Sequence, residues 1–447
     1  MPHAAHILLA AANDAERGRL AVMLADNGYR VSAAASSATA TALADELHPD
    51  VVMLGASLSE TDIAQATQAL KSSKRGGAMG VVVIAPQLTE SARCRSVLAG
   101  ADDVIEGSLS DTVLLARVRP LCRIATMQAE LSRRIATANS MGLPVAAGSS
   151  GAESDAPCRV MLVARPGSQP EREVRAALNG GFNVTVEDDP YRAGATVADE
   201  RFDAMVLSAD RAQSAEPVLY LASHLRNNPA LFNLPVMMLH GDGVFADEGD
   251  AYRYGASIAL GMPFEKSALA AGIRVLVRRQ RQRWTIRGAY RAIHDAIRPG
   301  SEIELYPADF LKLHLDAAAR EAQHDGRHLS VALFSLRNLG DIKRKFFSDA
   351  GDMLMNQVAS WIAGLVRTED LVARLDDDEM CVVLPDTTIE ECRAVTQRIV
   401  AILSASDFNL TEEVMQPIRI WVDGSCAALN AADTPATLLA RARQSQF

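Results

Sequence analysis

The chain has 447 residues, of which 49% are hydrophobic and 22% are charged, and its formal net charge is −10. This length is too great for one hydrophobic core and suits about three domains of an ordinary globular protein. The acidic balance argues against nucleic acid as the main partner, because binding to phosphates needs a concentrated basic surface.

The cysteines and the apolar runs indicate where the protein resides. No C-x-x-C pair is present, and no apolar run approaches the roughly 20 residues that a membrane span requires. The N-terminal run HILLAAA is too short and too poorly flanked for a signal peptide. We therefore expect a cytoplasmic protein with no direct membrane insertion, which reaches the cell pole, if at all, through partners. The cysteines are Cys94, Cys122, Cys158, Cys381, Cys392 and Cys426.

Two stretches of the chain share one order of predicted elements, the first starting at His6 and the second at Arg159. Each has a short apolar strand, an amphipathic helix, a glycine at the helix end, a second strand, another helix and a third buried strand. Continuous apolar runs such as VVML and AMVL, alternating with helical periods, are typical of a parallel sheet that helices cover on both faces. We therefore predict two doubly wound α/β domains. The predicted ranges are 1–139 and 158–280, with a Gly/Ser/Ala-rich linker at 140–157.

A third region follows a long basic helix. We predict a linker helix at 281–300 and a third domain at 301–447. The third domain has strand-like runs VALFSL and CVVL on either side of an acidic turn, and RIWVDGSCAAL before a last helix. Thr434 and Pro435 suit the N-cap and first turn of that helix.

The two repeats resemble the receiver domains of bacterial response regulators. In that family an Asp at the end of the third strand accepts a phosphoryl group, and two acids after the first strand hold Mg²⁺. Here the acceptor position is Gly55 in the first repeat and Ser208 in the second, and the first acid pair falls on Ala11 and Ala12. None of these residues supplies the required carboxylate. The resemblance implies two flavodoxin-like pseudo-receiver domains that serve docking, and we expect a homodimer through them.

The third region resembles the GGDEF domain of diguanylate cyclases, which has an α/β, nucleotidyl-cyclase-like fold. In that family an R-x-x-D pair, five residues and the GGDEF turn follow one another. Here they appear as Arg367-Thr-Glu-Asp370, then LVARL, then DDDEM at 376–380. The order of the three regions also resembles that of receiver–receiver–GGDEF proteins.

At the catalytic positions the sequence departs from that family. Asp376 and Asp377 stand where two glycines let the backbone approach GTP, and they add negative charge beside a triphosphate. Of the two carboxylates that hold the catalytic metals, one matches Asp378 and the other falls on Ser335, whose hydroxyl is a poor replacement. Glu379 completes the acidic run. We expect a degenerate domain without cyclase activity and without a catalytic metal.

The R-x-x-D half of the pattern matches the family's inhibitory site, which binds the product cyclic di-GMP away from the active site. Arg367 and Asp370 match that pair, and Arg398 matches a second Arg from the next helix. An Arg guanidinium forks onto guanine or phosphate, and an Asp accepts from guanine N–H groups. A structural ion pair at a helix end explains R-x-x-D alone equally well.

The sequence thus predicts a non-enzymatic cyclic di-GMP receptor and adaptor. The resemblance implies partners that are protein clients or protease-delivery factors, recruited to the cell pole for cell-cycle-regulated proteolysis. That step rests on likeness of architecture. Two alternatives stay open: a residual diguanylate cyclase, with the family's guanine-contacting Asp kept as Asp352, and a ligand-independent scaffold.

Three other patterns have simpler explanations. The run DDDE lacks the Gly and the spacing of a calcium loop, so we expect a solvated turn. His324 and His328 have helical spacing, but the Gly between them favours a surface turn. The seven arginines between Arg274 and Arg291 fit a linker helix with a solvated basic face, or one that lends arginines to the nucleotide, better than nucleic-acid binding.

Overall fold

The computed structural model describes the whole chain except residues 1–4, 56, 74–75, 86, 107–109, 144, 146–156, 229–230, 248, 302, 347–348, 410–416 and 446–447. The chain divides into two compact units. The repeat unit comprises His6–Ala125 and Ser150–Thr285, and the C-terminal unit comprises Met1–Ala5, Thr126–Ser149 and Ile286–Phe447. Most of the predicted linker at 140–157 lies outside the described residues.

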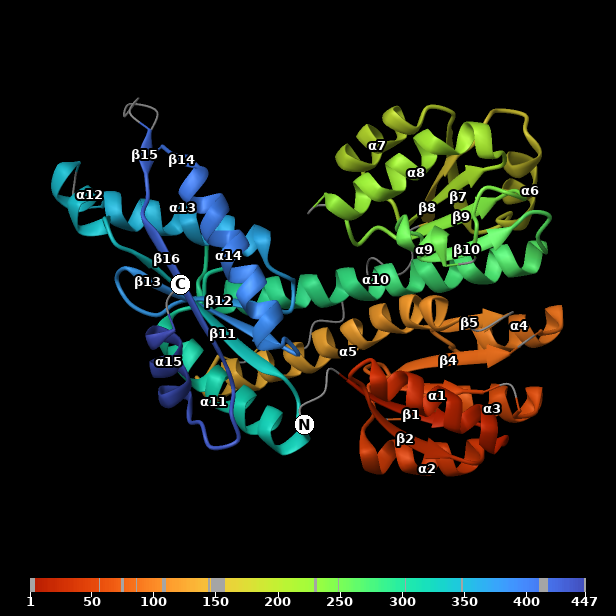
Figure 1. The fold of residues 1–447 in the computed structure, drawn as a ribbon, viewed down its shortest axis with the longest axis horizontal. Coiled ribbons are helices and arrows are strands. Elements are labelled where there is room, and N and C mark those ends of the chain that lie inside the picture. Colours follow the sequence, from red (N-terminus) through yellow and green to blue (C-terminus); the bar gives the residue numbers. More distant parts are fainter. Residues whose placement is uncertain are drawn as a thin grey trace. The chain divides into compact units, whose positions relative to one another are not determined.

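The first repeat alternates strands and helices (Figure 1). Its elements are β1 (His6–Ala10), α1 (Asp14–Asp26), β2 (Arg30–Ala34), α2 (Ser37–Leu47), β3 (Val51–Leu54), α3 (Glu60–Ser72), β4 (Gly80–Ala85), α4 (Glu90–Leu98), β5 (Asp103–Glu106) and α5 (Asp111–Ser140). The strands form one parallel sheet in the order β2-β1-β3-β4-β5. Apolar residues of α2, α3 and α4 pack on one face of this sheet.

The second repeat has the same succession of elements. They are β6 (Cys158–Val163), α6 (Gln169–Ala177), β7 (Phe182–Glu187), α7 (Pro190–Asp199), β8 (Ala204–Ala209), α8 (Ala212–Asn227), β9 (Val236–His240), α9 (Asp250–Arg253), β10 (Ile258–Gly261) and α10 (Lys266–Ile297). The sheet order is β7-β6-β8-β9-β10. Helices α7, α8 and α9 pack on one face, and α6 and α10 on the other. In both sheets the second strand of the repeat lies outside the first, and the third, fourth and fifth strands follow in order. This is the strand order of flavodoxin-like folds, so the predicted fold class is confirmed for both repeats.

One buried carboxylate has the same task in each repeat. Asp50 accepts a hydrogen bond from the backbone N–H of His6 at 2.7 Å, and Asp203 accepts one from the N–H of Arg159 at 2.7 Å. Each bond joins the residue before the third strand to the start of the first strand. Asp50 and Asp203 therefore tie two neighbouring strands together.

The first half of helix α10 is not the solvated basic face that the sequence predicts. Arg279 is 4% exposed and donates to Asp103 Oδ2 at 3.2 Å, and Arg117 Nε donates to the same oxygen at 2.8 Å. Arg281 pairs with Asp203 at 2.8 Å. The prediction is wrong here because these guanidinium groups find carboxylate and carbonyl partners within the repeat unit. The arginines of α10 with such contacts are Arg278, Arg279, Arg281 and Arg283, whereas Arg274, Arg287 and Arg291 are exposed.

Asp103, the first residue of β5, links the two repeats by accepting a hydrogen bond from Arg279 of α10. Burial raises the pKa of its carboxyl group, but the guanidinium groups of Arg117 and Arg279 outweigh this and bring the pKa below its usual value. Nearby, Val97 packs against Ala271 and Val275 of α10. The end of α4 and the start of β5 are thus covered by α10 of the second repeat.

The C-terminal unit contains an antiparallel sheet in the order β12-β13-β11-β16. Its elements are α11 (Ala308–Asp325), β11 (Leu329–Leu336), α12 (Leu339–Lys345), α13 (Ala350–Leu365), β12 (Leu371–Arg374), β13 (Glu379–Pro385), α14 (Ile389–Ala405), β14 (Asp407–Phe408), β15 (Ile418–Arg419), β16 (Val422–Ala428) and α15 (Pro435–Gln444). The predicted cap of the last helix is confirmed, since Thr434 accepts from the N–H of Thr437 and Pro435 opens α15.

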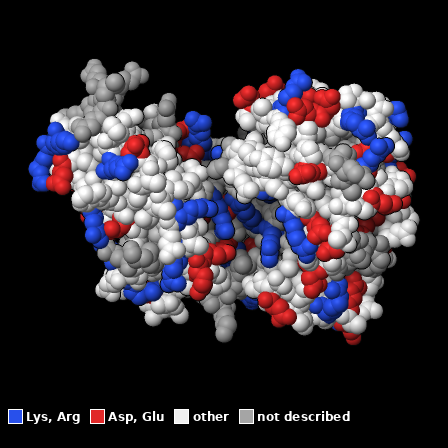
Figure 2. Space-filling model, turned by 45° about the horizontal axis from the view of Figure 1, so that its top comes forward, with Lys and Arg blue, Asp and Glu red and all other residues white. Residues whose placement is uncertain are grey.

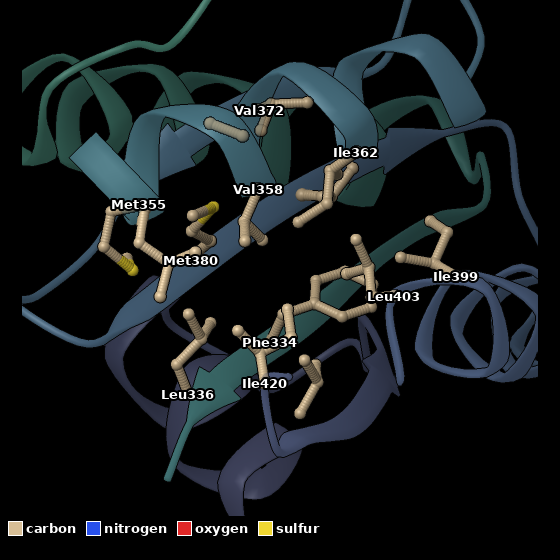
Figure 3. Packing of buried hydrophobic residues seen from close by; sticks show 14 of the residues in the cluster. Phe334, Leu336, Met355, Val358, Ile362, Val372, Met380, Ile399, Leu403 and Ile420 are labelled. Carbon is tan, nitrogen blue, oxygen red and sulfur yellow. The ribbon is translucent and has the colours of Figure 1, made fainter. Parts of the chain in front are cut away.

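The main core of this unit lies between the sheet and helices α13 and α14 (Figure 3). Phe334 and Met380 point from the sheet toward Val358 of α13 and Leu403 of α14. The other face of the sheet is covered by α11, α15 and the last turns of α5. This double cover fixes the hairpin between β12 and β13, and with it the two halves of the RTED–DDDEM pattern.

No helix in the described part of the chain is long and apolar enough to cross a membrane. Basic and acidic side chains are mixed over the face of the molecule that Figure 2 draws.

Candidate functional site

The R-x-x-D sequence forms a closed turn between α13 and β12, which we call the RTED turn (residues 367–370). Asp370 Oδ2 accepts from the backbone N–H of Arg367 at 2.7 Å, and the N–H of Asp370 donates to Arg367 O at 3.1 Å. Arg398 on α14 donates from Nη2 to Leu365 O at 2.8 Å. The structure therefore brings all three predicted ligand residues to the end of α13.

The three residues differ in accessibility. The side chains of Arg367 and Arg398 are exposed, whereas Asp370 is 7% exposed. Arg367 thus exposes its guanidinium on a turn whose shape depends on a buried carboxylate, and Arg398 exposes a second guanidinium beside the turn on α14. The sequence predicts that Asp370 accepts from a guanine, but in the structure its Oδ2 closes the turn.

The acidic turn at 376–378 carries three exposed aspartates, Asp376, Asp377 and Asp378. Arg374, the last residue of β12, holds this turn by donating to Asp376 O at 3.2 Å and to Asp377 O at 3.1 Å. The same guanidinium donates to Asp352 Oδ1 at 2.9 Å. Asp352, at the position where the family contacts guanine, is therefore engaged by a side chain of its own domain.

Ser335 and Glu379 lie directly opposite each other in the antiparallel register of β11 and β13. Arg443 from α15 donates from Nε to both oxygens of Glu379, at 3.2 and 3.1 Å. Glu379 is 8% exposed, and its hydrogen bonds raise the pKa of Arg443. At this end of the two central strands one position offers a hydroxyl, and the carboxylate opposite it is paired with Arg443.

These donors differ from the carboxylate oxygens that Mg²⁺ prefers. Among the residues that the structure describes, no three His, Cys, Asp or Glu side chains are grouped so that they could hold a metal ion. His324 is exposed in the last turn of α11, next to Asp325. Asp378 is exposed at the turn, whereas Glu379 is buried at the start of β13 and bound by Arg443.

A buried charged cluster lies behind the RTED turn. Arg134 of α5, 2% exposed, donates to Glu130 Oε1 at 2.8 Å, and His314 Nε2 lies 3.0 Å from the same oxygen. Burial opposes ionisation of Glu130, but His314 and Arg134 hold the pKa of its carboxyl group well below its usual range. Burial lowers the pKa of His314, and the carboxylate of Glu130 opposes this shift.

Arg134 also reaches the RTED turn. Its Nη2 donates to Glu369 O at 2.8 Å and to Asp370 O at 3.0 Å. The aromatic ring of Tyr290 lies under its guanidinium, 4.2 Å from centroid to Cζ. Sequence analysis missed Arg134, Arg374 and Arg443, and no local pattern singles them out because their partners belong to other elements.

The two positions that the resemblance matches to a phosphoacceptor, Gly55 and Ser208, have the same place in their sheets. Leu54 pairs with Ala10 in the first sheet and Leu207 with Val163 in the second, and Gly55 and Ser208 follow directly. A Cβ at Gly55 would lie 3.0 Å from Ala11 Cβ and 3.1 Å from Ala10 O. A larger side chain there would have to displace its neighbours, because both contacts are tighter than ordinary packing allows.

Comparison with known proteins places this geometry in a class. Residues 304–446 match the family model "Diguanylate cyclase, GGDEF domain". The C-terminal part of the chain is therefore a GGDEF domain, and the predicted α/β order of two flavodoxin-like domains followed by a GGDEF domain is confirmed.

One relative matches almost the whole chain. It is the response regulator PleD of Caulobacter vibrioides, 26% identical over 420 residues, which are 94% of this chain and 91% of PleD. The diguanylate cyclase TpbB of Pseudomonas aeruginosa is 29% identical over 162 residues, 34% of this chain and 33% of TpbB. Among solved structures, the GGDEF domain of DgcB from Caulobacter crescentus, in complex with c-di-GMP, has a TM-score of 0.30 and 18% identity, covering 31% of this chain and 82% of that one.

Proposed function

We propose that this protein is a cyclic di-GMP receptor that lacks cyclase activity and acts as an adaptor. The observation that carries the proposal is the pair of exposed guanidinium groups of Arg367 and Arg398 at one closed turn. Cyclic di-GMP offers two phosphates and two guanine Hoogsteen edges, the acceptors that a guanidinium fork fits. Asp370 sets the turn that presents Arg367.

The DDDEM half of the hairpin, residues 376–380, supports the hypothesis that the domain is not catalytic. Ser335 replaces a metal-binding carboxylate, and Arg443 neutralises Glu379. Arg374 donates a hydrogen bond to Asp352, and it also donates to the backbone of the acidic turn. One carboxylate is replaced by Ser335, and the carboxylates of Asp352 and Glu379 are bound by arginines of the same domain. We therefore infer that this site holds no catalytic metal and does not condense GTP.

We propose the adaptor role from the likeness of architecture. The receiver–receiver–GGDEF order resembles that of PopA, whose group recruits substrates to the cell pole for regulated proteolysis during the cell cycle. We accordingly propose protein clients or protease-delivery factors as partners, with polar localisation through them. A homodimer through the receiver-like domains is part of the proposal. It has to use surfaces other than the end of α4 and the start of β5, which α10 covers within the repeat unit.

Calorimetric titration of the full chain with cyclic di-GMP tests this function. Arg367→Ala should weaken binding by about 10- to 100-fold, since a charged hydrogen bond contributes about 1.5–3 kcal/mol. Arg419→Ala is the matched control, because Arg419 is exposed in the same domain and pairs with Asp407 instead. Absence of heat from the wild type, or equal affinity in Arg367→Ala, would favour the ligand-independent scaffold.

A residual diguanylate cyclase is the second candidate, favoured by the exposed Asp378 at the turn and by the match to the cyclase family model. Incubation with GTP and Mg²⁺, followed by chromatography of the nucleotides, distinguishes the two. We expect no cyclic di-GMP. Product formed by the wild type and lost in Asp378→Ala would establish the enzyme instead.

A further inference from the structure

Helix α5 supports the RTED turn from behind. The turn's two carbonyl groups, Glu369 O and Asp370 O, both accept from one nitrogen of Arg134 at 2.8 and 3.0 Å. Arg134 is 2% exposed and Glu369 is 1% exposed, so water does not replace these bonds. Arg134 therefore supports from α5 the turn that the Asp370 carboxylate closes.

The position of Arg134 is itself fixed on several sides. Glu130, one turn earlier on α5, accepts from its Nε at 2.8 Å. The ring of Tyr290 lies beneath the guanidinium, and the hydroxyl of Tyr290 donates to Met127 O on α5 at 2.7 Å. His314 of α11 closes the other side of Glu130 at 3.0 Å. Arg134 therefore has partners on several sides, and removing one member of such a buried network leaves the others unsatisfied.

We infer that Arg134 is a positioning residue of the cyclic di-GMP site, so that ligand on the RTED turn and the placement of α5 are thermodynamically coupled. The inference rests on the proposed function. Helix α5 begins at Asp111 in the first receiver-like repeat and ends at Ser140 in the C-terminal unit. A ligand that binds best to the supported turn stabilises the Arg134 contacts, and by linkage a partner that shifts α5 changes ligand affinity by the same factor.

Two variants of the full chain test the positioning role. Arg134→Gln removes the charge that bridges Glu130 and the turn, whereas Arg134→Lys keeps a charge without the fork. The matched control is Arg133→Gln, because the neighbouring Arg133 also binds Glu130 but reaches Glu321 at 3.0 Å instead of the turn. Circular dichroism and hydrogen exchange of β11 check that each variant is folded.

Hydrogen exchange without ligand is the first readout. The peptide around 366–371 should exchange at least tenfold faster in Arg134→Gln than in the wild type, with Arg134→Lys between them and Arg133→Gln unchanged. Unchanged exchange in a folded Arg134→Gln would overturn the inference. This measurement is independent of cyclic di-GMP, so it separates failure of the positioning role from failure of the proposed function.

Titration with cyclic di-GMP is the second readout. Arg134→Gln should bind about tenfold more weakly, equivalent to about 1.4 kcal/mol, while Arg133→Gln binds as the wild type does. Ligand should also slow exchange in residues 126–140 of the wild type. If the wild type binds and its 126–140 segment is unaffected, or if Arg134→Gln binds equally well, the coupling does not exist.

Discussion

Asp103 gives the sharpest test of how the two repeats are held together. Its side chain is buried and accepts from Arg117 Nε at 2.8 Å, from Arg279 Nη2 at 3.2 Å and from the N–H of Val104 at 2.8 Å. Asp103→Ala removes this shared partner and leaves Arg117 and Arg279 buried as neighbouring positive charges.

The size of the effect follows from these contacts. Two charge-assisted hydrogen bonds contribute about 1.5–3 kcal/mol each, and removal of one partner of a buried pair costs about 3–5 kcal/mol. We therefore expect Asp103→Ala to lower the free energy of unfolding of the repeat unit by about 3–5 kcal/mol. Asp103→Asn keeps one acceptor oxygen, but it removes the negative charge and places an N–H₂ donor against the guanidinium groups, so it should lose about as much.

Tryptophan fluorescence isolates the repeat unit. Trp284 belongs to it, whereas Trp361 and Trp421 belong to the C-terminal unit. With Trp361→Phe and Trp421→Phe as background, urea unfolding followed by fluorescence reports on the repeat unit. Glu200→Gln, which breaks the exposed pair with Arg159, is the control and should cost less than about 1 kcal/mol. If Asp103→Ala cost no more than this control, the reasoning would be refuted.

Two further predictions concern pH and packing. Because the folded pKa of Asp103 lies below its unfolded value of about 3.9, its stabilisation is complete above that value and is lost as pH falls through the folded pKa. Urea unfolding between pH 7 and 3 should therefore show a steeper acid loss for the wild type than for Asp103→Asn, and parallel curves would contradict this. A Cβ at Gly424 would lie 2.6 Å from Val400 Cγ2 and 2.8 Å from Thr396 Cγ2, so Gly424→Ala should cost about 1–3 kcal/mol in thermal unfolding. Gly364→Ala, in the helix α13 with open space around it, should instead stabilise by about 0.5–1 kcal/mol, and equal signs would disprove the packing argument.

Much of the fold could be predicted from local sequence patterns. The runs VVML and AMVL become the buried central strands β3 and β8, and the Thr434–Pro435 start of α15 is where the capping rule puts it. The spacing of Arg367, Asp370 and Arg398 likewise places them at one turn. These features depend on neighbours in the sequence or on the order of elements, which the sequence displays directly.

The remaining features depend on pairs far apart in the chain. Arg134 meets the RTED turn across more than 200 residues, and Glu379 meets Arg443 from the last helix. The sequence between Arg274 and Arg291 contains no acidic residue and therefore predicts a solvated basic face. In the structure, however, Arg279 is buried against Asp103 of the other repeat. Such partners become visible only when the fold brings the elements together.

The two repeats have different sequences, but Asp50 and Asp203 make the same hydrogen bond in each of them. Each carboxylate binds a backbone N–H, so the residue that provides the donor is free to change, and it is His6 in one repeat and Arg159 in the other. A contact of this kind produces no co-varying pair, since only one of its two side chains matters. Analyses of correlated substitutions would overlook it, although it has the same form in both copies after their sequences have drifted apart.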